Sequence, residues 1–376
     1  MPNLKIPAAR ITIPDEDIAE MLPKFQAILK SGQLTLGPYT QEFEKAFAEH
    51  HGNKHAVAVN SGTSSLEIIL RCLEAEDKKV IVPANTFFAT AAAAVHAGGK
   101  VAFVDSAPDH LMADADKLEK MVDKKTGAVV LVHTGGYVHP DIRRIQDLCD
   151  DKGVPLVEDA AHAHGSRFDG EFAGKFGRAS SFSFYPTKVI TSGEGGMIVT
   201  DDEEIAKRAR VFRDQGKAGF TTNFHTELGY NWRLSELNAL LGVHQMKRLG
   251  EFVKRRQAAA KIYDKGLEGL RRIRRVGRPK ESEPNFYKYL AVLDPKVNRL
   301  EVKKTLKEKF DVSLSGEVYD TPLHLQPIFK KLVGAKPGQF PVAEEVCARH
   351  VCLPMYPYIT PQEQEHVLAS VAEVLG

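Results

Sequence analysis

Apolar strand-like segments alternate with helical segments through the first two thirds of this chain of 376 residues. Such alternation predicts an α/β fold in which mostly parallel strands carry helices on both faces. The predicted strands are 55–59, 80–82, 101–104, 128–132, 155–158, 180–184 and 196–200. The predicted helices between them are 64–73, 88–96, 117–122 and 141–150. Ligands of such sheets bind at the carboxyl ends of the strands, so we look for function in the loops that follow them.

The pattern becomes helical after residue 202, with helices expected over 203–214 and 235–269. Because the second segment is long for one helix, we expect a break at Gly250. A Pro- and charge-rich stretch, 271–284, then predicts a crossover into a second domain, and we interpret its basic part, 271–280, as a solvated connector.

We therefore expect a large domain over 1–250, with an N-terminal arm, and a smaller C-terminal α/β domain over 251–376. The elements predicted for the smaller domain are a strand at 286–293 and helices at 300–310 and 361–375.

The composition of the chain argues against several classes of binding partner. The 51 Lys and Arg residues nearly balance 49 Asp and Glu residues, so the net charge of +2 does not favour nucleic acid or a membrane surface as a partner. No apolar stretch approaches the roughly 18 residues of a membrane-spanning helix. Residues 1–17 lack the apolar core of a secretion signal, and the four cysteines are scattered without a CxxC pair. We expect a cytoplasmic protein without a bound metal.

An acidic pair ends one predicted strand. The apolar run 154–157 leads directly into Glu158 and Asp159, and His162 and His164 follow. A buried acid at this position needs a cationic partner, and the alternative is a structural ion pair or a turn cap. The two histidines have no third ligand at a defined spacing, so a metal site is not favoured.

A lysine follows another predicted strand. Lys188 lies between the strands 180–184 and 196–200, in a loop rich in hydroxyl groups and glycine. An amine held between two buried strands is suited to Schiff-base chemistry, which needs a lysine with a lowered pKa. A surface turn with a solvated lysine is the alternative.

The third motif is the segment 60–65, which follows the strand 55–59 and opens a helix. Its free N–H groups and hydroxyl groups suit a phosphate, although an ordinary Ser/Thr N-cap has the same residues. Together, the three motifs are the parts of a pyridoxal phosphate site. The lysine binds the aldehyde, the acid keeps the ring nitrogen protonated, and the helix start holds the phosphate.

With these residues, the sequence resembles the sugar aminotransferases of the DegT/DnrJ/EryC1/StrS family, a branch of the aspartate aminotransferase fold (fold type I of the pyridoxal phosphate enzymes). The resemblance covers nearly the whole chain, through the motifs at 32–38, 61–63, 82–87, 158–165, 182–197, 229–234 and 322–327. Two segments depart from the family pattern where the keto-sugar should bind. They are 133–137 and Val318, which precedes Tyr319.

The resemblance implies a role for individual residues. Lys188 would be the Schiff-base lysine and proton shuttle, and Asp159 the partner of the ring nitrogen. The other implied cofactor contacts are Gly62, Thr63 and Ser183 on the phosphate, Phe87 stacked on the ring and His162 on the ring hydroxyl.

Three further residues are carried over outside this set. Asn231 matches an asparagine that reaches the phosphate of the other subunit, which implies a homodimer with shared active sites. Tyr319 and His324 fall in C-terminal motifs near the substrate pocket.

The implied activity is that of a pyridoxal phosphate-dependent aminotransferase. It would move an amino group from L-glutamate to a nucleotide-linked keto-sugar and so form an amino-sugar. Alternatives are a free keto-sugar, a keto-inositol or a related small ketone as acceptor. A dehydratase of the same fold carries histidine in place of the lysine, so Lys188 argues against it. A non-catalytic cofactor-binding relative is disfavoured by Lys188 and Asp159 together.

Overall fold

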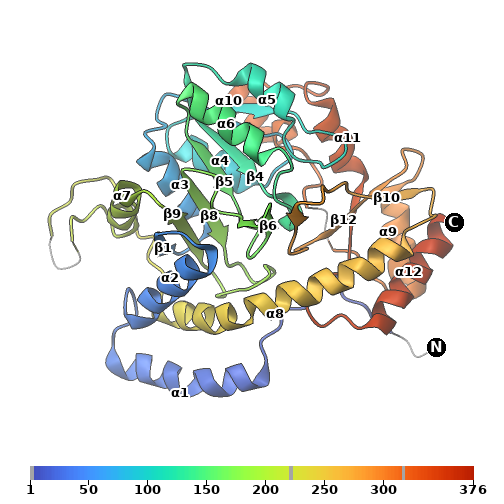
Figure 1. Ribbon diagram of the computed structural model, residues 1–376, viewed down its shortest axis with the longest axis horizontal. Helices are drawn as coiled ribbons and strands as arrows, with labels where there is room; N and C mark the ends of the chain where they lie inside the picture. Colours follow the sequence, from blue (N-terminus) through green and yellow to red (C-terminus); the bar gives the residue numbers. More distant parts are fainter. Residues whose placement is uncertain (1–3, 220–222, 316–317) are drawn as a thin grey trace.

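Seven strands form the central sheet of the computed structural model, which describes residues 4–219, 223–315 and 318–376 (Figure 1). Their spatial order is β1 (His55–Val59), β9 (Gly196–Thr200), β8 (Ala179–Ser183), β5 (Leu156–Asp159), β4 (Thr126–Val132), β2 (Lys79–Pro83) and β3 (Lys100–Val104). The pairs from β3 to β8 are parallel, and β9 is antiparallel to both of its neighbours. The predicted mostly parallel α/β sheet is confirmed, with each of the seven predicted strands in it. Residues 1–3 of the expected N-terminal arm lie outside the described residues.

Helices cover both faces of this sheet. Side chains of successive residues in a strand point to opposite faces, and in β4 Ala128 and Val130 join one apolar cluster while Val129 and Leu131 join another. The first cluster includes α3 (Gly62–Cys72), α4 (Phe88–His96) and α7 (Glu203–Arg213). The second includes α2 (Pro38–His51), α5 (Ala115–Met121), α6 (Ile142–Lys152) and the first half of α8 (Glu236–Gly266). Such burial on both faces explains why the strands are nearly continuous apolar runs.

The N-terminal region contributes two helices that the sequence analysis did not predict. α1 (Asp15–Ser31) and α2 both pack against α8. The carboxylate of Glu236, at the start of α8, accepts hydrogen bonds from the backbone N–H groups of Gly37, Tyr39 and Thr40. This contact fixes the start of α2 to the start of α8.

The helix α8 runs for 31 residues without interruption, so the expected break at Gly250 is wrong. Its first half packs against α2, and its second half packs against α12 (Pro361–Leu375). Figure 1 shows α8 extending from beneath the sheet to the C-terminal helices. We predicted a break from the length of the segment alone, but packing along the whole of α8 stabilises one continuous helix.

A second, smaller sheet lies in the C-terminal part. It is antiparallel, in the order β10 (Ile273–Arg275), β12 (Tyr289–Leu293) and β13 (His350–Leu353). Beside it lie α9 (Arg299–Phe310), α11 (Pro341–Arg349) and α12, whereas α10 (Pro327–Val333) packs Phe329 against Phe88 and Phe103 at the central sheet. This part has its own apolar cluster, which includes Tyr263, Tyr289 and Tyr356. The division of the chain at residue 250 stays a prediction, and α8 runs across that position.

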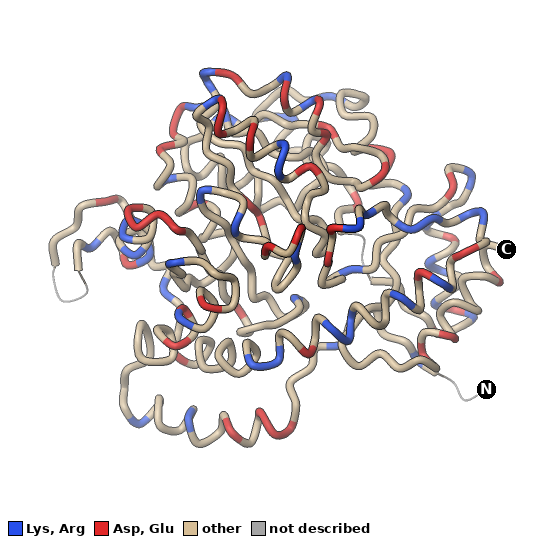
Figure 2. The backbone as a smooth tube through the Cα atoms, viewed as in Figure 1, with Lys and Arg blue, Asp and Glu red and all other residues tan. Residues whose placement is uncertain are grey.

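The basic stretch 271–280 is more ordered than the connector we expected. It contains the edge strand β10, in which Ile273 is buried while Arg274 and Arg275 are exposed. Arg278 forms an ion pair with Asp264. In Figure 2, basic and acidic residues are mixed over the whole molecule, in keeping with the small net charge.

A third, short sheet joins the two parts of the chain. Its order is β11 (Ser282–Glu283), β6 (Arg167–Phe168) and β7 (Glu171–Phe172). Within the described part of the chain, no helix is both long and apolar enough to cross a membrane.

Candidate active site

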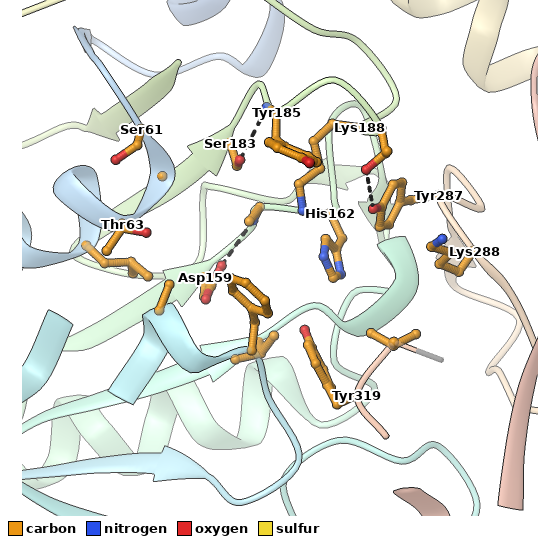
Figure 3. A pocket seen from close by; sticks show the side chains of 18 of the residues that line it. Ser61, Thr63, Asp159, His162, Ser183, Tyr185, Lys188, Tyr287, Lys288 and Tyr319 are labelled. Atoms are coloured by element: carbon orange, nitrogen blue, oxygen red, sulfur yellow. Dashed lines mark hydrogen bonds between the residues drawn. The ribbon is translucent and has the colours of Figure 1, made fainter. Parts of the chain in front are cut away.

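A cavity of about 380 Å³ opens at the carboxyl ends of β4, β5 and β8. Val132, Asp159 and Ser183 line it from the ends of these three strands, and the start of α3 lines it from the side (Figure 3). This edge is where parallel sheets bind their ligands. Eight of the ten predicted site residues line the cavity, and these are Gly62, Thr63, Phe87, Asp159, His162, Ser183, Lys188 and Tyr319.

The acidic pair at the end of β5 divides between the two faces of the sheet. Asp159 lines the cavity, whereas Glu158 is fully buried and points the other way. The Glu158 carboxylate is 2.8 Å from Nε2 of His133 and accepts hydrogen bonds from the Ser180 hydroxyl and from the backbone N–H groups of Gly174, Phe176 and Gly177. Glu158 therefore has the structural role that we weighed as an alternative, and Asp159 is the member of the pair that lines the cavity.

Asp159 is held by few hydrogen bonds for a buried carboxylate. Thr90 donates its hydroxyl to Oδ2 at 2.7 Å, and the backbone N–H of Ala161 donates to Oδ1 at 3.2 Å. Burial raises the pKa of Asp159, while these two hydrogen bonds and the charge of Lys188 lower it. A cation placed against this carboxylate would therefore stabilise its ionised form.

Lys188 lies on the loop after β8, and its side chain reaches into the cavity (Figure 3). Its Nζ atom is 4.9 Å from the centre of the Tyr287 ring. Burial of the ammonium among protein atoms lowers the pKa of Lys188 to about 7, against the opposing effect of Asp159 and with a further lowering by Lys288. This lowering favours the free amine, which is the nucleophilic form.

The start of α3 forms a close cradle with β8 and β9. Ser61 is the N-cap, and its hydroxyl accepts from the backbone N–H of Ser64 at 3.1 Å. A Cβ atom on Gly62 would lie 2.8 Å from Cβ of Ser183, and one on Gly196 would lie 2.2 Å from the Ser61 carbonyl oxygen. Glycine at both positions lets the start of α3 lie this close to β8 and β9, and the first N–H groups of a helix favour an anion there.

Three rings line the cavity beside the lysine. His162 lies between Tyr287 and Tyr319, with ring centres 4.5 Å and 6.3 Å away. Burial lowers the pKa of His162 well below its usual value, so the ring is neutral. The backbone N–H of Gly135 donates to Nδ1 at 3.2 Å, which leaves the proton on Nε2. Phe87 is 60% exposed and lines the cavity, so it is not part of the apolar core.

Two predicted residues lie outside this cavity. Asn231 is exposed, and its backbone forms an isolated bridge with Asp214. His324 is fully buried, with Nε2 3.0 Å from a carboxylate oxygen of Glu344. The structure therefore does not bring His324 to the substrate side of the cavity, and Asn231 does not reach the site of its own chain.

Among the residues of the site that sequence reasoning missed, three have polar groups at or near the cavity. Tyr287 and Lys288 line the cavity from the segment just before β12, about a hundred residues after Lys188 in the chain. Thr90, which bonds Asp159, lies in the first turn of α4. None of the three belongs to a motif with a defined spacing, although Thr90 follows the predicted motif at 82–87 by one helical turn.

The residues present fit pyridoxal phosphate. Lys188 provides an amine with a lowered pKa, Asp159 an anion suited to a protonated ring nitrogen, and the start of α3, which lines the cavity, backbone N–H groups suited to a phosphate. The fold and this site define a pyridoxal phosphate-dependent enzyme of fold type I. The family model of the DegT/DnrJ/EryC1/StrS aminotransferases matches residues 15–372, so the chain belongs to that family.

Comparison with known proteins agrees with this assignment. The dTDP-3-amino-3,4,6-trideoxy-alpha-D-glucose transaminase of Micromonospora megalomicea subsp. nigra is 34% identical over 363 residues, which cover 96% of each chain. The GDP-perosamine synthase of Escherichia coli O157:H7 is 32% identical, with 90% of each chain covered. Spr1654 of Streptococcus pneumoniae, solved in a PLP form and a PMP form, has a TM-score of 0.91 at 26% identity and covers 99% of this chain and 98% of its own. The protein is an aminotransferase, and its cofactor is pyridoxal phosphate.

Proposed function

We propose that the protein transfers an amino group from L-glutamate to a nucleotide-linked keto-sugar. The observation that carries this proposal is the convergence of Lys188, Asp159 and the start of α3 on one cavity, in a chain of this family. One relative is named for a dTDP-linked amino-glucose and another for GDP-perosamine. These names support a sugar nucleotide as the acceptor, and they differ in the nucleotide.

Each residue of the site has a defined task in such a transfer. When bound, pyridoxal phosphate supplies a ring that accepts electrons from the substrate carbon. Asp159 keeps the ring nitrogen protonated. Lys188 holds the cofactor at rest and then moves a proton to and from the reacting carbon of the substrate. A base with a pKa near 7 suits this proton transfer at neutral pH.

We also propose that two chains build each active site. Asn231 is exposed and away from the cavity of its own chain, as expected for a residue that contacts the phosphate in a partner. Phe87 and Tyr185 are large exposed side chains that line the cavity. Further exposed apolar side chains lie on the segment between α7 and α8, and these are Phe224, Leu228 and Tyr230. A second chain packed on these surfaces would remove them from water.

A cytoplasmic location accompanies this proposal. In the described part of the chain, Cys72, Cys149, Cys347 and Cys352 are buried and no disulfide joins them. Cysteines without disulfides are typical of a reducing compartment.

A substrate panel tests the proposed function. The cofactor-loaded enzyme is mixed with L-glutamate, and the absorption of the cofactor is followed. It is then assayed with glutamate and 3-keto or 4-keto sugars carried on dTDP, UDP and GDP, with free keto-sugars and keto-inositols in parallel. We expect a spectral change with glutamate and turnover of at least one nucleotide-linked sugar. Faster turnover of a free ketone would contradict the proposed substrate, and a spectrum unchanged by glutamate would contradict the proposed donor.

A further inference from the structure

A second lysine, Lys288, lines the cavity directly before β12. Its backbone N–H donates to the carbonyl oxygen of Gly135 at 3.0 Å, which ties this segment to the loop after β4. Figure 3 shows Lys288 at the opposite end of the pocket from Ser61 and Thr63, beyond Tyr287. Its side chain therefore lies away from the phosphate cradle, on the side left for substrate.

The positive charge of Lys288 is not balanced by a carboxylate. Within residues 4–219, 223–315 and 318–376, no Asp or Glu forms an ion pair with it, and its Nζ atom is 5.2 Å from the centre of the Tyr287 ring. The neighbouring cation Arg256 is buried and donates to the carbonyl oxygens of Phe286 and Met355. Burial lowers the pKa of Lys288, and the charge of Arg256 acts in the same direction. A partly buried cation in such surroundings is costly unless a ligand supplies the opposite charge.

The position of Lys288 suits an anion on the substrate. Nζ of Lys188 is 4.9 Å from the centre of the Tyr287 ring, and Nζ of Lys288 is 5.2 Å from it, so the two nitrogens are no more than about 10 Å apart. Neither of the two carboxylates that line the cavity, Asp159 and Glu194, forms an ion pair with Lys288. Asp159 accepts from Thr90, and Glu194 is exposed on the loop before β9.

We propose that Lys288 is a substrate-binding residue that holds an oxyanion of the substrate while the reacting carbon lies at Lys188. This inference rests on the proposed function, which offers two sources of the oxyanion. They are the carboxylate of the amino donor and a phosphate of the nucleotide-linked sugar. A lysine ammonium binds either as a point charge, and the ion pair offsets the cost of the buried cation when substrate enters.

Three variants test this role. Lys288→Met removes the charge and keeps an unbranched apolar chain, and Lys288→Arg keeps the charge. Lys296→Met is the matched control, because Lys296 is an exposed lysine outside the cavity in the loop after β12. The cofactor-loaded proteins are titrated with L-glutamate by absorption. They are also titrated by calorimetry with whichever of dTDP-, UDP- or GDP-glucose the wild type binds, because these sugars have no ketone to react.

We expect Lys288→Met to weaken the binding of glutamate or of the sugar nucleotide by about tenfold or more, as for other lost hydrogen bonds to charged groups. Lys288→Arg should restore most of the affinity, and Lys296→Met should bind as the wild type does. A loss confined to glutamate assigns the donor carboxylate, and a loss confined to the sugar nucleotide assigns a phosphate.

Unchanged dissociation constants for both ligands in Lys288→Met would overturn the inference. Should Lys288→Met lose its cofactor or melt at a lower temperature, Lys288→Gln takes its place in the same titrations. A wild-type protein that responds to neither glutamate nor any of the three sugars would instead overturn the proposed function, so the two failures are distinguished.

Discussion

Among the described residues, the Thr90 hydroxyl and the Ala161 N–H donate to the Asp159 carboxylate, and Thr90→Val removes the first of these donors. The hydrogen bond measures 2.7 Å, and both side chains are buried. Burial already raises the pKa of Asp159, so the ionised form depends on the donors and cations around it. Valine keeps the branched shape of threonine, which leaves the loss of the hydroxyl as the main change.

The expected size of the effect follows from this single bond. A hydrogen bond to a charged group contributes about 1.5–3 kcal/mol, and one pKa unit corresponds to about 1.4 kcal/mol. Thr90→Val should therefore raise the pKa of Asp159 by about 1–2 units. A carboxylate with a raised pKa loses its charge earlier as the pH falls, so the variant should lose activity at a higher pH than the wild type.

The assay is kcat/KM for L-glutamate between pH 5 and 9, together with the retention of cofactor after dialysis at each pH. We expect the acidic limb of the Thr90→Val profile to lie about 1–2 pH units higher, with little change on the alkaline side, where Asp159 is ionised in both proteins. Thr90→Ser keeps the hydroxyl and should follow the wild type. An acidic limb that does not move in Thr90→Val would refute the argument that this hydroxyl keeps the carboxylate ionised.

Four further outcomes are expected. Lys188→Ala should abolish turnover but still bind cofactor non-covalently, and borohydride reduction of the wild type should label Lys188 alone; a label on another lysine would contradict the assignment. Asp159→Ala should lower kcat by several orders of magnitude at an unchanged melting temperature, and a near-normal kcat would give the role to another acid. Mixing Lys188→Ala with Asn231→Ala subunits should restore roughly a quarter of the wild-type activity, because about half of the dimers then have one intact site; no recovery despite subunit exchange would place Asn231 outside the partner's site. Gly250→Ala should raise the free energy of unfolding by about 0.5–1 kcal/mol, because the added Cβ meets nothing within 4 Å in a continuous helix; a lower melting temperature would show that Gly250 is needed for a bend.

The cofactor side of the site could be predicted because its parts are local in sequence. Asp159 and Ser183 end strands, Lys188 follows the second of them closely, and Gly62 opens the helix after β1. In a mostly parallel sheet these positions meet at one edge, so the motifs define a site once the strands are recognised. The alternation of side chains also shows that Glu158 and Asp159 face opposite ways, but it does not show which of them faces the ligand.

The substrate side could not be predicted in the same way. Tyr287 and Lys288 reach the cavity only because β12 and the short β11–β6 pairing bring the C-terminal part against the loops of the central sheet. This contact joins segments far apart in the sequence, so no motif with a fixed spacing could predict it. His324 was carried over by resemblance alone, and its bond to Glu344 depends on packing with α11.

The N-terminal helices and the basic stretch were missed for local reasons. Pro23 lies inside α1, where proline ordinarily argues against a helix. The charges of 271–280 hide two buried side chains, Ile273 and Val276, and Ile273 lies in the three-residue edge strand β10. In both cases the packing outweighs the local preference of the chain.

The uninterrupted α8 has a consequence for how this protein unfolds. At 1.5 Å per residue its 31 residues extend over about 46 Å, and the helix contributes side chains to the apolar clusters of both the central sheet and the C-terminal part. If one part unfolded alone, its half of α8 would lose its packing and expose apolar side chains, while the other half remained folded. Heat should therefore melt both parts together, in one cooperative calorimetric transition rather than two.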